Sequence, residues 1–242
     1  MGAPPGLGRP PSLLGVTIRR ATVLGRFFLG YGTVLSVLMG VSLAVSSGSA
    51  FPSAFPFLLP VFGSVGSMGA LTVFTSDRIK GALEYMLAYG IPARRIFAEV
   101  LAACLVLVTI IVCVAVGAGV GAYLARGHAP SLALAEGLGL YAIPMTYASA
   151  AFATTVGMYW TALSSPSMGM SSPIGVAPLI GILPPVIVLL SITALAASGG
   201  VSSPDAAWRI GVLAMVTVTA VTVGLLASIG HLLRQERLLS PS

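Results

Sequence analysis

Four long stretches of this 242-residue chain contain no Asp, Glu, Lys or Arg, and they limit what the chain can fold into. They are residues 27–76, 100–125, 137–204 and 210–233. An α-helix needs about 20 apolar residues to cross the hydrocarbon core of a bilayer, so the second and fourth stretches each hold one span. The first and third are each long enough for two. The sequence therefore predicts six membrane-spanning helices.

Each of the two longer stretches has a centre rich in residues that break helices. In the first, Ser46-Ser47-Gly48-Ser49 is followed by Phe51-Pro52. In the second, the segment from Ser164 to Pro173 holds two prolines, a glycine and five serines. These breaks place the expected spans at about 27–46, 54–75, 98–125, 137–163, 173–198 and 208–232.

Composition agrees with a membrane protein. Charged residues make up 7% of the chain, whereas a soluble domain carries about 25%. The chain therefore lacks the charge to cover a water-facing surface, and six spans leave no room for a separate soluble domain. We expect a single all-α domain over residues 1–242 that crosses the cell membrane several times.

The net charge of +6 is distributed as a topology signal. Positive residues stay on the cytoplasmic side during insertion. Only Arg126 and Arg209 fall on one side of a six-span topology. The other side holds Arg9, Arg19, Arg20, Arg26, Arg78, Lys80, Arg94, Arg95, Arg234 and Arg237. Both termini and the loop 77–99 are thus expected in the cytoplasm, in contact with lipid headgroups, and nucleic acid is not expected as a partner.

The loop between the second and third spans carries the periodicity of an amphipathic helix. Gly90 suits the left-handed position that ends a helix, and Pro92 suits the first turn of the next one. Arg95 and Glu99 form an i,i+4 pair where that helix enters the membrane. Apolar residues recur at spacings of three and four, away from Asp77, Lys80 and Glu84: they are Ile79, Ala82, Leu83, Met86 and Leu87.

Residues Asp77-Arg78-Ile79-Lys80-Gly81-Ala82-Leu83-Glu84, then Met86-Leu87, then Gly90-Ile91-Pro92-Ala93-Arg94-Arg95 resemble the coupling helix of type-2 ATP-binding-cassette (ABC) transporter permeases. In that family the helix lies between spans two and three, and a proline turn and basic residues follow it. The likeness extends to the number of spans, an interfacial N-terminal segment and cytoplasmic termini. The chain differs in having Glu99 where the family often has lysine, and in its short outer loop 199–208.

The resemblance implies the transmembrane subunit of an ABC exporter, driven by a separate ATPase subunit that docks on residues 77–95. It also implies a second permease subunit, identical or different, with ATP and Mg held by the ATPase. The implied docking residues, with Glu84 as the main contact, are Asp77, Arg78, Lys80, Glu84, Met86, Leu87, Arg94 and Arg95. By periodicity alone, the helix fits a partner's groove and the lipid surface equally well.

Enzymatic motifs are missing from the sequence. It has no G-x-x-x-x-G-K-[S/T] phosphate loop and no H-E-x-x-H motif. Its two histidines, His128 and His231, are expected near opposite membrane faces, where they cannot share a metal ion. We therefore expect no catalysis, cofactor or metal site in this chain.

The substrate pathway is the least defined part of the prediction. Its candidate residues lie in the fourth span and are Tyr141, Thr146, Tyr147 and Thr154. The same hydroxyl groups also suit hydrogen bonds between helices. Likewise, the G-x-x-x-G of Gly117 and Gly121 suits either a dimer contact or packing within one subunit.

Two other functions fit the same composition. A small ion-coupled secondary transporter usually places an ionisable group in the bundle, and Glu136 is the nearest candidate. A membrane anchor that does not transport would use the same docking helix without a pathway. Recovery of an ATPase partner separates the exporter from the carrier, and substrate-stimulated turnover separates it from the anchor.

Overall fold

The computed structural model describes residues 13–46, 48–163, 173–197 and 204–232, and this part of the chain contains helices and no strands. A 3₁₀ turn, η1 (Ser64–Gly66), joins α3 to α4, and a π-helix, η2 (Gly137–Ala142), joins α7 to α8. The α-helices are α1 (Leu13–Leu24), α2 (Arg26–Ser46), α3 (Phe51–Gly63), α4 (Ser67–Ile79), α5 (Ala82–Ala88), α6 (Ala93–Ala125), α7 (Leu132–Glu136), α8 (Ile143–Leu163), α9 (Pro173–Ala197) and α10 (Pro204–Leu232).

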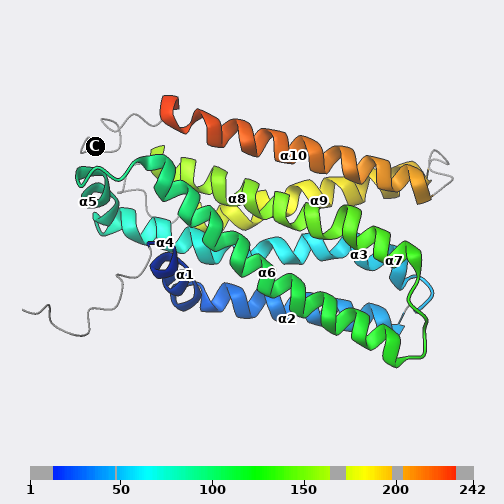
Figure 1. The fold of residues 1–242 in the computed structure, drawn as a ribbon. Coiled ribbons are helices and arrows are strands. Elements are labelled where there is room, and N and C mark those ends of the chain that lie inside the picture. Colours follow the sequence, from blue (N-terminus) through cyan, green and yellow to red (C-terminus); the bar gives the residue numbers. More distant parts are fainter. Residues whose placement is uncertain (1–12, 47, 164–172, 198–203, 233–242) are drawn as a thin grey trace, which may run out of the picture.

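The long helices lie side by side as one bundle, with α2 packed on α6 and α8 packed on α9 and α10 (Figure 1). Helices α1 and α5 and the last turn of α10 lie at one end, here called the α5 end. Helix α7 lies at the opposite end, here called the α7 end. Helix α1 runs crosswise to the bundle and packs against α4 and α6. The loop of residues 77–99 and the start of the first expected span therefore lie at the same end.

Four helical segments are long and apolar enough to cross a membrane: Arg26–Ser46, Phe51–Ile79, Ala93–Ala125 and Trp208–Ser228. They correspond to the first, second, third and sixth expected spans. The second is longer than expected because α3, η1 and α4 follow one another without a break.

The fourth and fifth expected spans are helical too, as α8 and α9. Helix α8 is rich in hydroxyl groups, which lowers its hydropathy, and α9 includes the apolar segment Ile182–Ala194. That these two helices cross the membrane stays a prediction.

The start of the fourth expected span is irregular. Proline has no N–H to continue an α-helical ladder, and the six residues Gly137–Ala142, which end two positions before Pro144, form a π-helix. Neighbouring helices fill the space beside it. A Cβ on Gly137 would lie 2.7 Å from the Trp208 ring and 2.8 Å from Pro56. Glycine is therefore needed at Gly137, where α10 and α3 both approach the backbone.

A glycine pair sets the close packing of α2 on α6. A Cβ on Gly40 would lie 3.2 Å from the Cα of Gly119 and 3.0 Å from the Phe55 ring. By contrast, Gly117 and Gly121 have open space around them and are exposed. The glycine that packs within the subunit is thus Gly119, and the predicted G-x-x-x-G pair faces outward.

Aromatic rings pack in a row near the α7 end. Phe55 stacks on Phe51, Phe51 on Tyr123, and Tyr123 on His128, with centroid separations of 4.8, 4.8 and 4.7 Å. The row joins α3, the last turn of α6 and the loop after α6. Stacked rings of this kind add about 0.5–1.5 kcal/mol per pair beyond the burial of their surface.

The substitution Gly119→Leu tests the α2–α6 packing. A leucine side chain would overlap Phe55 and the Gly40 backbone, and overpacking of this kind costs about 1–3 kcal/mol. We expect a lower unfolding temperature in detergent, measured by intrinsic fluorescence. Gly117→Leu, two residues away and facing open space, is the control and should leave that temperature unchanged. Equal effects of both substitutions would contradict the packing.

Candidate functional site

The α5 end holds a hairpin in which α5 connects the end of α4 to the start of α6. The sequence predicts one helix from Asp77 to Tyr89, and this is wrong at Gly81. Helix α4 ends at Ile79, Gly81 adopts a left-handed conformation with φ of 72°, and α5 begins at Ala82. The physical reason is that glycine enters this region without steric cost, so the chain turns between the two helices.

The second turn follows the prediction closely. Gly90 has a φ of 79°, its N–H donates to the Leu87 carbonyl at 3.0 Å, and the Ile91 N–H donates to the Met86 carbonyl at 3.0 Å. These two bonds form a Schellman motif, which satisfies the last carbonyls of α5. Pro92 lies one residue before α6, as its N-cap, instead of in the first turn. Both ends of α5 are therefore fixed by defined turns.

The apolar stripe of α5 packs against the protein's own bundle. Leu83 and Leu87 are only 2% and 5% exposed. Met86 lines a cavity beside Phe74 and Val100. The resemblance places Met86 and Leu87 at a partner's groove, whereas both pack inward here, because the bundle end leaves apolar surface that α5 covers.

The outward surface of the hairpin is aromatic instead. Tyr85, Tyr89 and Ile79 are 69%, 85% and 71% exposed. Beside them Lys80 is exposed, and Glu84 is half-buried, with an Oε2 that lacks a hydrogen-bond partner among the described residues. We call these five residues the outer face of the hairpin. Tyr85 and Tyr89 are not among the predicted docking residues, although their i,i+4 spacing places them on one side of a helix.

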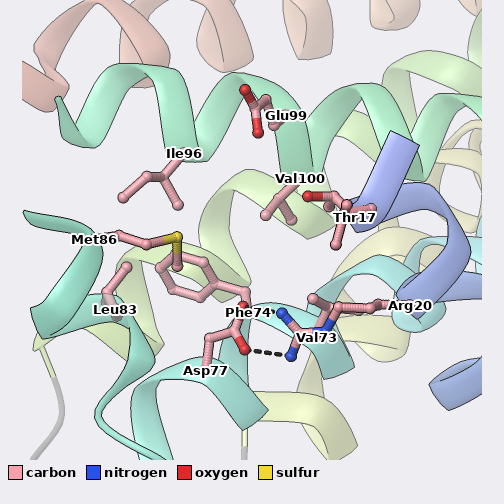
Figure 2. A pocket seen from close by; sticks show the side chains of 11 residues that line it. Thr17, Arg20, Val73, Phe74, Asp77, Leu83, Met86, Ile96, Glu99 and Val100 are labelled. Carbon is pink, nitrogen blue, oxygen red and sulfur yellow. Dashed lines mark hydrogen bonds and ion pairs between the residues drawn. The ribbon is translucent and has the colours of Figure 1, made fainter. Parts of the chain in front are cut away.

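Asp77 is tied to α1 by a bidentate ion pair (Figure 2). The Arg20 Nη1 donates to Asp77 Oδ2 at 3.0 Å, and Nη2 donates to Oδ1. The Asp77 side chain is only 9% exposed, whereas that of Arg20 is 39% exposed. Asp77 was predicted on the polar side of the docking helix, but it faces the bundle because Arg20 compensates its charge. Paired donors of this kind fix geometry as well as charge.

A small cavity of about 50 Å³ lies behind α5, where α1, α4, α5 and α6 meet (Figure 2). Arg20 and Asp77 line one side, and Met86 and Glu99 line others. The predicted i,i+4 pair is confirmed, since Arg95 Nε donates to Glu99 Oε1 at 3.2 Å. The cavity is thus lined mainly by apolar side chains, with Arg20, Asp77 and Glu99 as its charged groups, and it has room for a water molecule.

The remaining predicted docking residues lie in different places. Arg78 is half-buried at the end of α4. Arg94 is exposed on the first turn of α6, where it lines a groove shared with α10. Of the predicted docking residues, Lys80 and Glu84 are thus the ones on the outer face, whereas Arg94 lines the groove beside α10.

The four candidate pathway residues are engaged in packing. Thr154 donates to the Cys104 Sγ at 3.1 Å, and Tyr147 and Thr109 share a hydrogen bond of 2.7 Å, so both link α8 to α6. Thr146 is fully buried and donates to the carbonyl of residue 142 at 2.6 Å. Tyr141 is also fully buried, between Phe57 and Trp208. None of the four lines the cavity of Figure 2, and their role in a pathway stays a prediction.

Glu136, the candidate for ion coupling, ends α7 and is exposed at the α7 end.

Comparison of the chain with protein-family models, curated proteins and solved structures finds no match. The geometry of the hairpin, together with the resemblance of its residues to a coupling helix, is therefore what supports a functional proposal.

The substitution Arg20→Leu tests the link between α1 and α4. It leaves the buried Asp77 carboxylate without its partner, which costs about 1–3 kcal/mol. Unfolding in detergent should occur at a lower temperature. Arg19→Leu, an exposed neighbour with the same loss of charge, should change stability by less than about 0.5 kcal/mol. The double variant Arg20→Leu/Asp77→Leu should recover part of the loss, and no recovery would contradict a specific pair.

Proposed function

We propose that this chain is the transmembrane subunit of an ABC exporter, and that a separate ATPase subunit docks on the hairpin of residues 77–95. The observation that carries the proposal is the rigid mounting of α5. Leu83 and Leu87 anchor it to the bundle, and glycine turns close both of its ends. A helix held this way across a bundle end can transmit force to the helices on both sides of it.

The outer face offers the chemistry of a protein interface. Tyrosine is enriched among the residues that contribute most to binding, because it buries a large rigid ring and keeps a polar end. Tyr85 and Tyr89 are the two most exposed side chains that suit this role in the hairpin. Glu84 adds a half-buried carboxylate to this face, and a cation on a second protein would pair with its exposed part.

Movement of the hairpin would reach three helices. Helices α4 and α6 continue directly from its two turns. Helix α1 follows α4 through the Arg20–Asp77 pair. We infer that closure of an ATPase dimer would tilt α4 and α6 together and carry α1 with them.

The same proposal includes six spans with both termini and α5 in the cytoplasm. Helices α8 and α9 would supply the fourth and fifth crossings in the cell membrane. The exposed face of α6 with Gly117 and Gly121 is where a second permease subunit, identical or different, would make close contact. ATP and Mg would be bound by the ATPase subunits.

Affinity purification from native membranes tests the docking. We expect wild-type chain to retain an ATPase that carries a phosphate-loop motif, and Glu84→Arg to weaken that association at least tenfold, because the new cation would meet the donor that Glu84 pairs with. Glu136→Arg makes the same change of charge at the α7 end and should retain the ATPase. Tyr89→Ala should weaken binding without lowering the unfolding temperature.

Two results would contradict the proposal that the chain belongs to an exporter. In one, no ATPase is recovered while ATPases of other transporters survive the same detergent. In the other, Glu84→Arg and Glu136→Arg behave alike. If an ATPase is retained but no compound stimulates its turnover, the chain is a membrane anchor.

Labelling of single cysteines tests the topology. In a background with Cys104 and Cys113 replaced by alanine, Tyr89→Cys and Leu132→Cys present exposed thiols at opposite ends of the bundle. A maleimide that cannot cross membranes should label Leu132→Cys on intact cells and Tyr89→Cys only after permeabilisation. The reverse pattern would contradict a cytoplasmic α5.

A further inference from the structure

The start of α6 and the end of α10 leave a groove between them at the α5 end of the bundle. Its volume of about 450 Å³ lies within the range of sites that hold small molecules. One cation and five aliphatic side chains line it: Arg94, Ala98, Leu101, Val223, Leu226 and Ala227.

The cation in this groove is unpaired within the part of the chain that the structure describes. Arg94 forms no ion pair with any residue that the structure describes, and it is exposed. Its neighbour Arg95 differs, because Arg95 is paired with Glu99. The two arginines are adjacent in sequence, but only Arg94 lines the groove.

The position of the groove along the helices favours a lipid. Ala98 begins the third expected span, whereas Ala227 lies near the end of the sixth, so the aliphatic walls stand at the depth of acyl chains. Arg94 precedes the span and lies at headgroup level, where arginine side chains commonly keep their charge. Basic pockets between membrane helices bind anionic headgroups at the cytoplasmic side.

We propose that this groove binds one phospholipid with an anionic headgroup, whose phosphate pairs with Arg94 and whose acyl chain lies along Ala98, Leu101 and Val223. A lipid with a zwitterionic headgroup would bring its own cation toward Arg94 and would bind less tightly. The site faces α10 and does not include the outer face of the hairpin. It requires only that the bundle lies in a membrane, and it is independent of an ATPase partner.

Native mass spectrometry of the purified full-length chain tests the site. The chain is titrated with phosphatidylglycerol and, separately, with phosphatidylcholine. We expect one phosphatidylglycerol to be retained more tightly than phosphatidylcholine. Arg94→Gln should weaken its binding about tenfold, as expected for the loss of one charge-assisted contact. Arg95→Gln removes the same charge one residue away and should bind phosphatidylglycerol like the wild type.

A second variant keeps the cation and fills the groove. Ala98→Phe places a ring where the acyl chain would lie, and because Ala98 is exposed the fold should tolerate it. Binding of phosphatidylglycerol should be lost although Arg94 is present. Inorganic phosphate in large excess should leave phosphatidylglycerol bound, since phosphate lacks the acyl chain.

Four outcomes would overturn the lipid site. They are equal retention of the two lipids, equal binding by Arg94→Gln and Arg95→Gln, displacement of the lipid by inorganic phosphate, and a change of oligomeric state in Ala98→Phe with unchanged lipid binding. The last result would instead assign the groove to a second copy of the chain. Recovery of the ATPase is a separate measurement, so failure of this site and failure of the exporter proposal are distinguishable.

Discussion

The high cost of charge inside a bilayer shapes this molecule. An ionised side chain at the centre of the hydrocarbon is expensive, and the chain keeps Asp, Glu, Lys and Arg out of its long apolar stretches. Every such residue that the structure describes therefore lies near one end of the bundle, and most lie at the α5 end. The middle of the bundle is left with glycine contacts, aromatic packing and buried hydroxyl groups, some of which, as in Thr146 and Thr154, bond to neighbouring backbone or side chains.

At the α5 end the charges are organised into distinct sets. Arg20 and Asp77 join α1 to α4, whereas Arg95 and Glu99 stabilise the first turns of α6. Glu84 on the outer face and Arg94 in the groove form no ion pair with any residue that the structure describes. Because the paired charges hold the hairpin to its neighbours, the proposals for a protein partner and for a lipid rest on the two charges that are left over.

The sequence predicted the lengths of the helices and the positions of turns better than it predicted which face of a helix is buried. Long runs without charge gave the helices, and Gly90 gave the second turn, because both signals are local. Gly81 was misread because the apolar spacing continues across it, and spacing does not reveal whether a glycine is helical or left-handed. Periodicity showed that α5 has an apolar side, but not that its own bundle would cover Leu83 and Leu87. The Arg20–Asp77 pair joins residues 57 positions apart, and no local pattern predicts that.

Helix α6 connects these features along the length of the bundle. Its 33 residues form one uninterrupted helix, about 50 Å long at the usual rise per residue. Ile96 in its first turns belongs to the same buried cluster as Leu83 and Leu87 of α5, and Arg94 lines the groove beside α10. Its last turn stacks Tyr123 between Phe51 and His128. A displacement of the hairpin therefore need not pass through a flexible loop, because the helix that receives it at the α5 end is the helix that carries the aromatic row at the α7 end.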